Sequence, residues 1–202
     1  MNPIQGKKLY GWIIHPIIMT TTPKKISFIG IMTALCIVTN YMLIGVPNVK
    51  FMDLFVFVSG YTMGMLSGAL VGVLTWLVYG TLNPYGFNLP TLAATCTGES
   101  IYGIMGGVLS GRLYLKTDRL RFYKGFWEGN LILGVIGFLL TFIYDLFTNI
   151  VTALVFEIPL IACLVAGIPF ALIHEASNFI IFFLLGNVMI NTTQKLCEVM
   201  GN

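Results

Sequence analysis

The sequence predicts an all-α integral membrane protein, a bundle of six transmembrane helices whose N and C termini both lie in the cytoplasm. Three observations predict this fold class. The chain is 57% hydrophobic and 9% charged, with a mean hydropathy of +0.89, whereas soluble domains average about 25% charged residues. Its apolar residues gather in six segments, and its Lys and Arg residues gather between particular segments. The net charge of +3 is not a nucleic-acid signal.

The six expected helices follow one another along the chain, with a very short connection between the second and the third. In order, they cover residues 26–46, 54–66, 69–82, 89–109, 131–156 and 161–190. A spanning helix needs about 20 residues, within a range of about 17–25, so the second and third segments are short. A re-entrant pair is an alternative for these two. We favour two tightly joined spans, because each extends into uncharged flanking sequence.

The positive residues indicate the orientation, because cytoplasmic loops carry an excess of Lys and Arg. All of the 11 Lys and Arg residues except Lys50 lie before the first segment, between the fourth and fifth, or after the sixth. Six spans put these three regions on one side of the membrane. The chain then divides into a cytoplasmic or interfacial segment (1–25), a six-helix membrane domain (26–190) and a cytoplasmic tail (191–202). The outer connections are residues 46–51, 83–88 and 157–160.

Small residues recur at intervals of four, which places them on one helix face and allows two backbones to approach each other. The sets are Gly60, Gly64, Gly68 and Gly72, then Gly103, Gly107 and Gly111, and finally Gly30 with Ala34. We interpret such sets first as contacts within the bundle. The alternative is a docking surface for another membrane subunit. Gly30 and Ala34 are the best candidates for docking, since they begin an otherwise ordinary helix near the cytoplasm.

Polar side chains form a stripe on each of the last three expected helices. They are Thr91, Thr95, Glu99 and Tyr102 on the fourth, Thr141, Asp145, Thr148, Asn149 and Thr152 on the fifth, and His174, Ser177 and Asn178, with Glu175 alongside, on the sixth. Residues three or four positions apart share a helix face. Because ionisable groups in lipid are costly, we expect the stripes to face one another and enclose a polar interior.

The ionisable residues of the three stripes are expected to lie at similar depths in the membrane. At 1.5 Å per residue, Glu99 and Asp145 each lie roughly 15 Å below the outer ends of their helices, and His174 lies about 18–20 Å below the outer end of its helix, so all three are near the midplane. The threonines above them then line a cavity open to the outside. The outer loops provide its mouth through Asn48, Lys50, Asp53, Asn83, Tyr85 and Asn88. The alternative is a buried cluster of polar groups that only holds the helices together.

Enzyme motifs are weak, and we predict neither an enzyme nor a bound cofactor or metal. His174 and Glu175 form an HE pair without a second His four residues later, so the zinc metalloprotease pattern fails. No G-x-S-x-G, Walker A or G-x-G-x-x-G motif occurs. The four cysteines form no C-x-x-C pair, and we interpret them as small buried residues. If the protein drives uphill transport, another chain hydrolyses the nucleotide.

Several motifs follow one another along the chain in a characteristic order. They are Gly30-x-x-x-Ala34, VPNVKFMD at 46–53 with LFVFVSG at 54–60, GMLSGALVG at 64–72, YGTLNP at 79–84, YDLFTN at 144–149 and HEASN at 174–178. Through the order of these motifs, over roughly residues 26–190, the chain resembles the substrate-binding membrane subunit (S component) of energy-coupling factor (ECF) vitamin transporters of bacteria and archaea.

The resemblance implies a six-helix bundle that captures a vitamin or related micronutrient from outside the cell. It also implies two kinds of partner, a transmembrane scaffold subunit and two cytoplasmic ATPases, and a location in the cytoplasmic membrane. In the family an A-x-x-x-A pattern on the first helix docks the scaffold, and this chain has Gly30 at the first position. The loaded subunit is expected to topple within the membrane and expose its site to the cytoplasm.

The substrate site is expected to draw residues from the outer loops and from all three polar stripes. The candidates are Asn48, Lys50, Asn83, Tyr85, Thr95, Glu99, Tyr102, Asp145, Asn149, His174 and Asn178. The expected cavity holds three acids, Glu99, Asp145 and Glu175, against one base, His174, with Lys50 at its mouth. We therefore expect a neutral or amine-bearing ligand. Two other hypotheses remain: a stand-alone proton-coupled transporter of a small polar molecule, and a membrane enzyme that uses His174 and Glu175 as acid and base.

Overall fold

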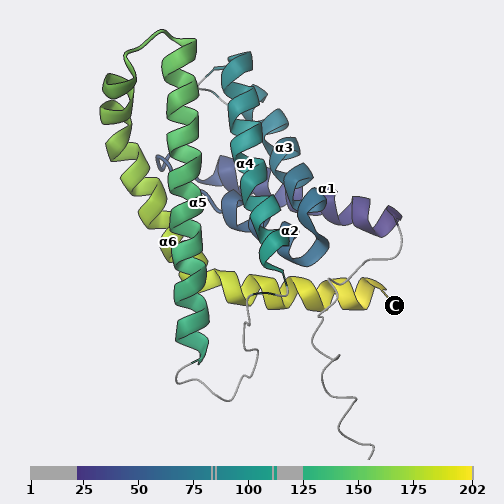
Figure 1. The fold of residues 1–202 in the computed structure, drawn as a ribbon. Coiled ribbons are helices and arrows are strands. Elements are labelled where there is room, and N and C mark those ends of the chain that lie inside the picture. The colour runs from purple at the N-terminus through teal and green to yellow at the C-terminus, as the bar shows by residue number, and fades with distance from the viewer. Residues whose placement is uncertain (1–21, 83, 85, 111, 113–124, 202) are drawn as a thin grey trace, which may run out of the picture.

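A computed structural model describes residues 22–82, 84, 86–110, 112 and 125–201 of the chain (Figure 1). These residues form helices and connections but no strand, so the all-α prediction is confirmed for this part. The helices are α1 (Thr22–Met42), α2 (Met52–Met63), α3 (Met65–Leu82), α4 (Leu89–Leu109), α5 (Gly125–Val155) and α6 (Leu160–Gly201). Each corresponds to one of the six segments expected from hydropathy.

In the part of the chain that the structure describes, four helices are long and apolar enough to cross a membrane by themselves, which supports a multi-pass membrane protein. These spans are Pro23–Met42, Met65–Leu82, Trp127–Val155 and Leu160–Val199. With 12 residues, α2 is too short, and the 21-residue α4 is not among the four. The polar stripe explains why α4 is not among the four, because its threonines, glycines and Glu99 lower the mean hydropathy of the helix. Length and hydropathy alone therefore support four of the six expected spans.

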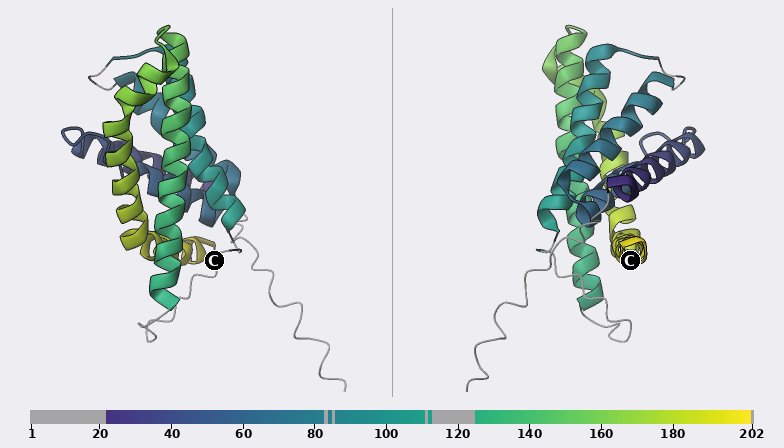
Figure 2. Two further views of the ribbon diagram at one scale, coloured as in Figure 1. Left: turned by 60° about the vertical axis from the view of Figure 1, so that its left-hand side comes forward. Right: turned by 90° about the vertical axis from the view of Figure 1, so that its right-hand side faces the viewer.

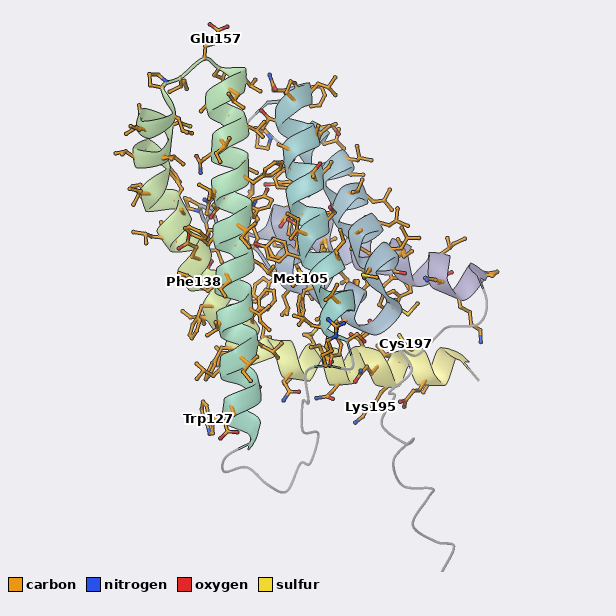
Figure 3. All side chains as sticks on the ribbon, viewed as in Figure 1. Met105, Trp127, Phe138, Glu157, Lys195 and Cys197 are labelled. Atoms are coloured by element: carbon orange, nitrogen blue, oxygen red, sulfur yellow. The ribbon has the colours of Figure 1, made fainter. Side chains whose placement is uncertain are left out.

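The helices pack around α4, which contacts α2, α3 and α5, while α6 packs on α5 and α2. On the far side, α1 packs on α2 and α3 and runs at a steep angle to α5 (Figures 1 and 2). The first part of α6 lies beside α5 in all views. Glu157 and Trp127 mark the two ends of α5 (Figure 3).

Several helix boundaries differ from the expected ones: α1 begins at Thr22, α2 covers Met52–Met63, α3 begins at Met65 and α5 begins at Gly125. The ends of α1 and α6 also differ. The first helix ends at Met42 rather than at residue 46, and turns follow it up to Asn48. The last helix continues past residue 190 to Gly201, and its final part turns to run across the end of the bundle (Figure 1). Cys197 is fully buried there, with its Sγ 3.6 Å from the Sδ of Met63. Figure 3 shows Lys195 on the opposite side.

Glycines let α2, α3 and α4 pack with their backbones in contact. A Cβ atom added to Gly60 would lie 1.8 Å from the carbonyl oxygen of Gly103, and one on Gly68 would lie 2.6 Å from the Cα of Gly60. The small-residue sets on these helices are thus internal contacts, as expected, while Gly111 lies outside the described residues. Gly64 differs, because its φ of 92° forms the one-residue turn between α2 and α3 and favours glycine.

Candidate functional site

A cavity of about 470 Å³ lies where the loop after α1 meets α3, α4 and α6. This volume is within the range of small-molecule sites, roughly 300–1,000 Å³. The lining residues are Asn40, Leu43, Ile44, Val46, Pro47, Asn48, Val49, Lys50, Trp76, Tyr79, Thr91, Thr95 and Phe170. Thr91 and Thr95 are the part of the α4 stripe that faces this cavity.

One wall of the cavity combines a cation with aromatic rings. The rings of Trp76 and Tyr79 meet edge to face, with centroids 5.6 Å apart. The Lys50 Nζ lies 4.7 Å from the Trp76 ring centroid and 5.9 Å from that of Tyr144, within the range of cation–π attraction. Among the described residues that line the cavity, Lys50 is the one that carries a charge. The wall therefore offers a flat apolar surface beside a positive group.

The loop that carries Lys50 is tied to α6 by hydrogen bonds. Asn48, which has a positive φ of 52°, donates through Nδ2 to the carbonyl oxygen of Phe170 at 3.1 Å. Ser177 Oγ donates to the carbonyl oxygen of Asn48 at 3.4 Å. These two contacts join the loop to the sixth helix across more than a hundred residues of sequence, so the position of Lys50 depends on α6.

His174 lies at the centre of a buried polar network beside the cavity. Its Nδ1 is 3.0 Å from Asp145 Oδ1, and its Nε2 is 2.8 Å from Asp53 Oδ2. The two aspartates are 8% and 1% exposed, and His174 is 1% exposed. An imidazole donates to a carboxylate on each side only when both nitrogens carry hydrogen. The expected meeting of Asp145 and His174 is confirmed.

Asp53 is the member of this network that the sequence placed wrongly. We expected it in the outer loop at the mouth of the cavity, but it lies in the first turn of α2 and is buried. The second helix begins at Met52, two residues before the expected start, which turns the Asp53 side chain inward. The sequence did contain a signal for this position, because Asp53 directly precedes the apolar segment that begins at Leu54.

Further hydrogen bonds extend the network to α4 and α5. Asn178 donates through Nδ2 to Asp53 Oδ2 at 2.5 Å and to Thr141 Oγ1 at 2.7 Å. Tyr102 OH donates to the same Thr141 oxygen at 2.9 Å. These four residues are buried, so Tyr102 and Asn178 hold helices together instead of lining the cavity.

Glu99 is a buried acid that contacts the cavity wall. Trp76 Nε1 donates to Glu99 Oε2 at 3.3 Å, and Glu99 is 1% exposed. Its Oε1 has no hydrogen-bond partner among the described residues, and the same holds for Asp53 Oδ1 and Asn178 Oδ1. Glu99 is absent from the cavity lining, so it acts on the cavity through Trp76.

The structure divides the predicted site residues among three places. Asn48, Lys50 and Thr95 line the cavity, whereas Glu99, Tyr102, His174 and Asn178 are buried beside it. Asp145 and Asn149 line a separate groove between α5 and α6. Asn83 and Tyr85 lie outside the described residues, as does most of the expected 1–25 segment.

Sequence reasoning missed most of the cavity lining, and the polar and aromatic residues that it missed are Asn40, Trp76, Tyr79 and Phe170. The spacing of Trp76 and Tyr79 was a usable signal. These aromatics are three residues apart, share a helix face, and directly precede the break at Pro84. Phe170 carried no such signal, because it is one apolar residue among many.

Comparisons with known proteins identify the family. Residues 24–186 match the family described as ECF transporter, substrate-specific component. Neither the curated proteins nor the solved structures contain a match to the chain. The family match begins near the start of α1 and ends within α6. The chain is therefore a member of the family of substrate-specific components of ECF transporters.

Proposed function

We propose that this protein captures a vitamin or related micronutrient from outside the cell and delivers it to an ATP-driven module on partner chains. The observation that carries the proposal is the 470 Å³ cavity in which Lys50 lies over the ring of Trp76. A concave, largely apolar site with a few placed polar groups is typical of small-molecule binding. The family match supports a transport role for that site.

The proposed orientation is six membrane-embedded helices with both termini in the cytoplasm of a bacterium or archaeon. Lys24, Lys25 and Lys195 support it, because they lie at the start of α1 and near the end of α6. In this orientation the loop that carries Asn48 and Lys50 faces the outside. Substrate then reaches the cavity without crossing the hydrocarbon core.

We propose a ligand with a flat ring and an anionic or strongly accepting group. The ring would stack on Trp76 and Tyr79, and the acceptor would contact Lys50, with Asn40, Asn48 and Thr95 as further hydrogen-bonding partners. This differs from the neutral or amine-bearing ligand expected from the sequence. The acids on which that expectation depended lie in the buried network or in the groove between α5 and α6.

Replacing Trp76 with alanine is expected to weaken ligand binding by about tenfold or more, since stacking and cation–π contacts of this kind contribute roughly 1–2 kcal/mol. The ligand is first identified by mass spectrometry of small molecules that co-purify with the protein. Its affinity for each variant is then measured by calorimetry. Trp127→Ala, at the far end of α5 (Figure 3), is the matched control. Unchanged affinity in Trp76→Ala would place the site elsewhere.

We further propose that the scaffold subunit docks on the face of α1 that carries Gly30 and Ala34. Both residues are exposed, and a Cβ added to Gly30 would meet no atom within 4 Å. Small residues on an exposed helix face allow close approach of another helix. Gly30 and Ala34 differ in this respect from the glycines of α2 and α4, which pack against other helices of the same chain.

Ala34→Leu is expected to abolish ATP-dependent uptake while ligand binding by the purified chain stays unchanged. A leucine there keeps the partner helix at a distance but disturbs nothing within this chain. Uptake is measured in cells that express the chain together with the ATPases and the scaffold. Ala93→Leu, at an exposed position of α4, is the control and should transport normally. Uptake by the chain alone, driven by a proton gradient, would instead favour a stand-alone transporter.

A further inference from the structure

A second groove, of about 450 Å³, lies between α5 and the first part of α6 and opens to the outside of the bundle. Most of its lining is apolar, and part of it is exposed, as Ile161 (78%) and Leu172 (60%) illustrate. Three polar side chains interrupt this surface, those of Asp145, Asn149 and Glu175. No basic residue lines it among the described residues. This combination distinguishes the groove from the cavity that contains Lys50.

Glu175 is the unusual member of the groove. It is 6% exposed, and its carboxylate accepts no hydrogen bond from any described residue. Asp145 differs, because its two oxygens lie 3.0 and 3.2 Å from His174 Nδ1. The Glu175 oxygens are not among the fully buried atoms without a partner, so they are open to the groove, where a carboxylate amid apolar side chains is costly unless it accepts a hydrogen bond. Since Glu175 lines the groove, a donor can approach its carboxylate from there.

We infer that this groove binds a small amphiphile with an apolar body and one protonated amine that donates to Glu175. The apolar lining would hold the body, and the carboxylate would hold the ammonium group through a charge-assisted hydrogen bond. Asn149 can contribute its amide oxygen, since its Nδ2 already donates to the carbonyl oxygen of Asp145 at 2.8 Å. The proposed ligand therefore has the opposite charge to the one that Lys50 favours.

The depth of Glu175 indicates access from the hydrocarbon core. It lies 15 residues after Leu160, the first residue of α6, which is about 22 Å along the helix axis. The hydrocarbon core is about 30 Å thick, so Glu175 lies inside it, far from the outer head groups and nearer to the cytoplasmic ones.

The test compares dodecylamine with dodecanol, which has the same apolar body without the cation. Native mass spectrometry of the full chain counts bound molecules, and the unfolding temperature is recorded in parallel. We expect one bound amine per chain and a rise in unfolding temperature with dodecylamine alone.

Glu175→Gln should weaken amine binding by about tenfold, and Leu172→Trp should obstruct the groove. Glu157→Gln, an exposed acid in the α5–α6 connection, should bind amine as the native chain does.

Several outcomes would overturn the inference. Equal binding of dodecanol would show a groove for any apolar chain, with no role for the carboxylate. Amine binding that survives both Glu175→Gln and Leu172→Trp would place the amine elsewhere. A dimer of the native chain that Glu175→Gln abolishes would assign the groove to a second copy. Each result is independent of the ligand that binds beside Lys50, so failure here leaves the proposed transport function intact.

Discussion

Replacing Gly60 with alanine is expected to prevent α2 from packing on α4. The added Cβ would lie 1.8 Å from the carbonyl oxygen of Gly103, and this atom belongs to the backbone, so no side-chain movement can relieve the clash. Overpacking a core usually costs about 1–3 kcal/mol, and we expect at least the upper end here. The unfolding temperature in detergent and the yield of monodisperse protein measure the effect.

Gly30→Ala is the matched control for this substitution. A Cβ at Gly30 meets no atom within 4 Å, and alanine in a helix interior is about 1 kcal/mol more favourable than glycine. The same chemical change should therefore leave α1 equally or more stable. If Gly60→Ala unfolded at the same temperature as the native protein, the close contact between α2 and α4 would be wrong.

His174→Ala is expected to produce the second large loss of stability. The substitution leaves Asp53 and Asp145 buried without the group that bridges them at 2.8 and 3.0 Å. Removing one partner from a buried ionic pair costs about 3–5 kcal/mol, because the remaining charge is uncompensated. Chemical denaturation in detergent micelles measures the change in the free energy of unfolding.

A double variant distinguishes the loss of charge balance from the loss of packing. Asp53→Asn removes one of the two carboxylates, so adding it to His174→Ala should cost less than the sum of the two single changes. Residues in one hydrogen-bond network typically deviate from additivity by about 0.5–3 kcal/mol. Strict additivity would mean that His174 contributes only its volume, and that its contacts with the aspartates carry no energy.

The convergence of Asp145 and His174 could be predicted because both depend on simple helix geometry. Each residue lies on a polar stripe, and a known rise per residue sets its depth. The place of Trp76 could not be predicted in the same way. Its role depends on Lys50, which α6 positions through the hydrogen bonds of Asn48 with Phe170 and Ser177. Such contacts between distant segments leave no periodic pattern in the sequence.

The sequence by itself determined the helical class, the six helices and the internal role of the glycines on α2, α3 and α4. These properties follow from hydropathy and from the 3.6-residue period, which act within one segment. The tertiary structure decided how the polar residues divide among the cavity beside Lys50, the network around His174 and the groove beside Glu175. Packing sets the rotation and tilt of each helix relative to its neighbours, so residues of one stripe, such as Thr95 and Glu99, reach different surroundings.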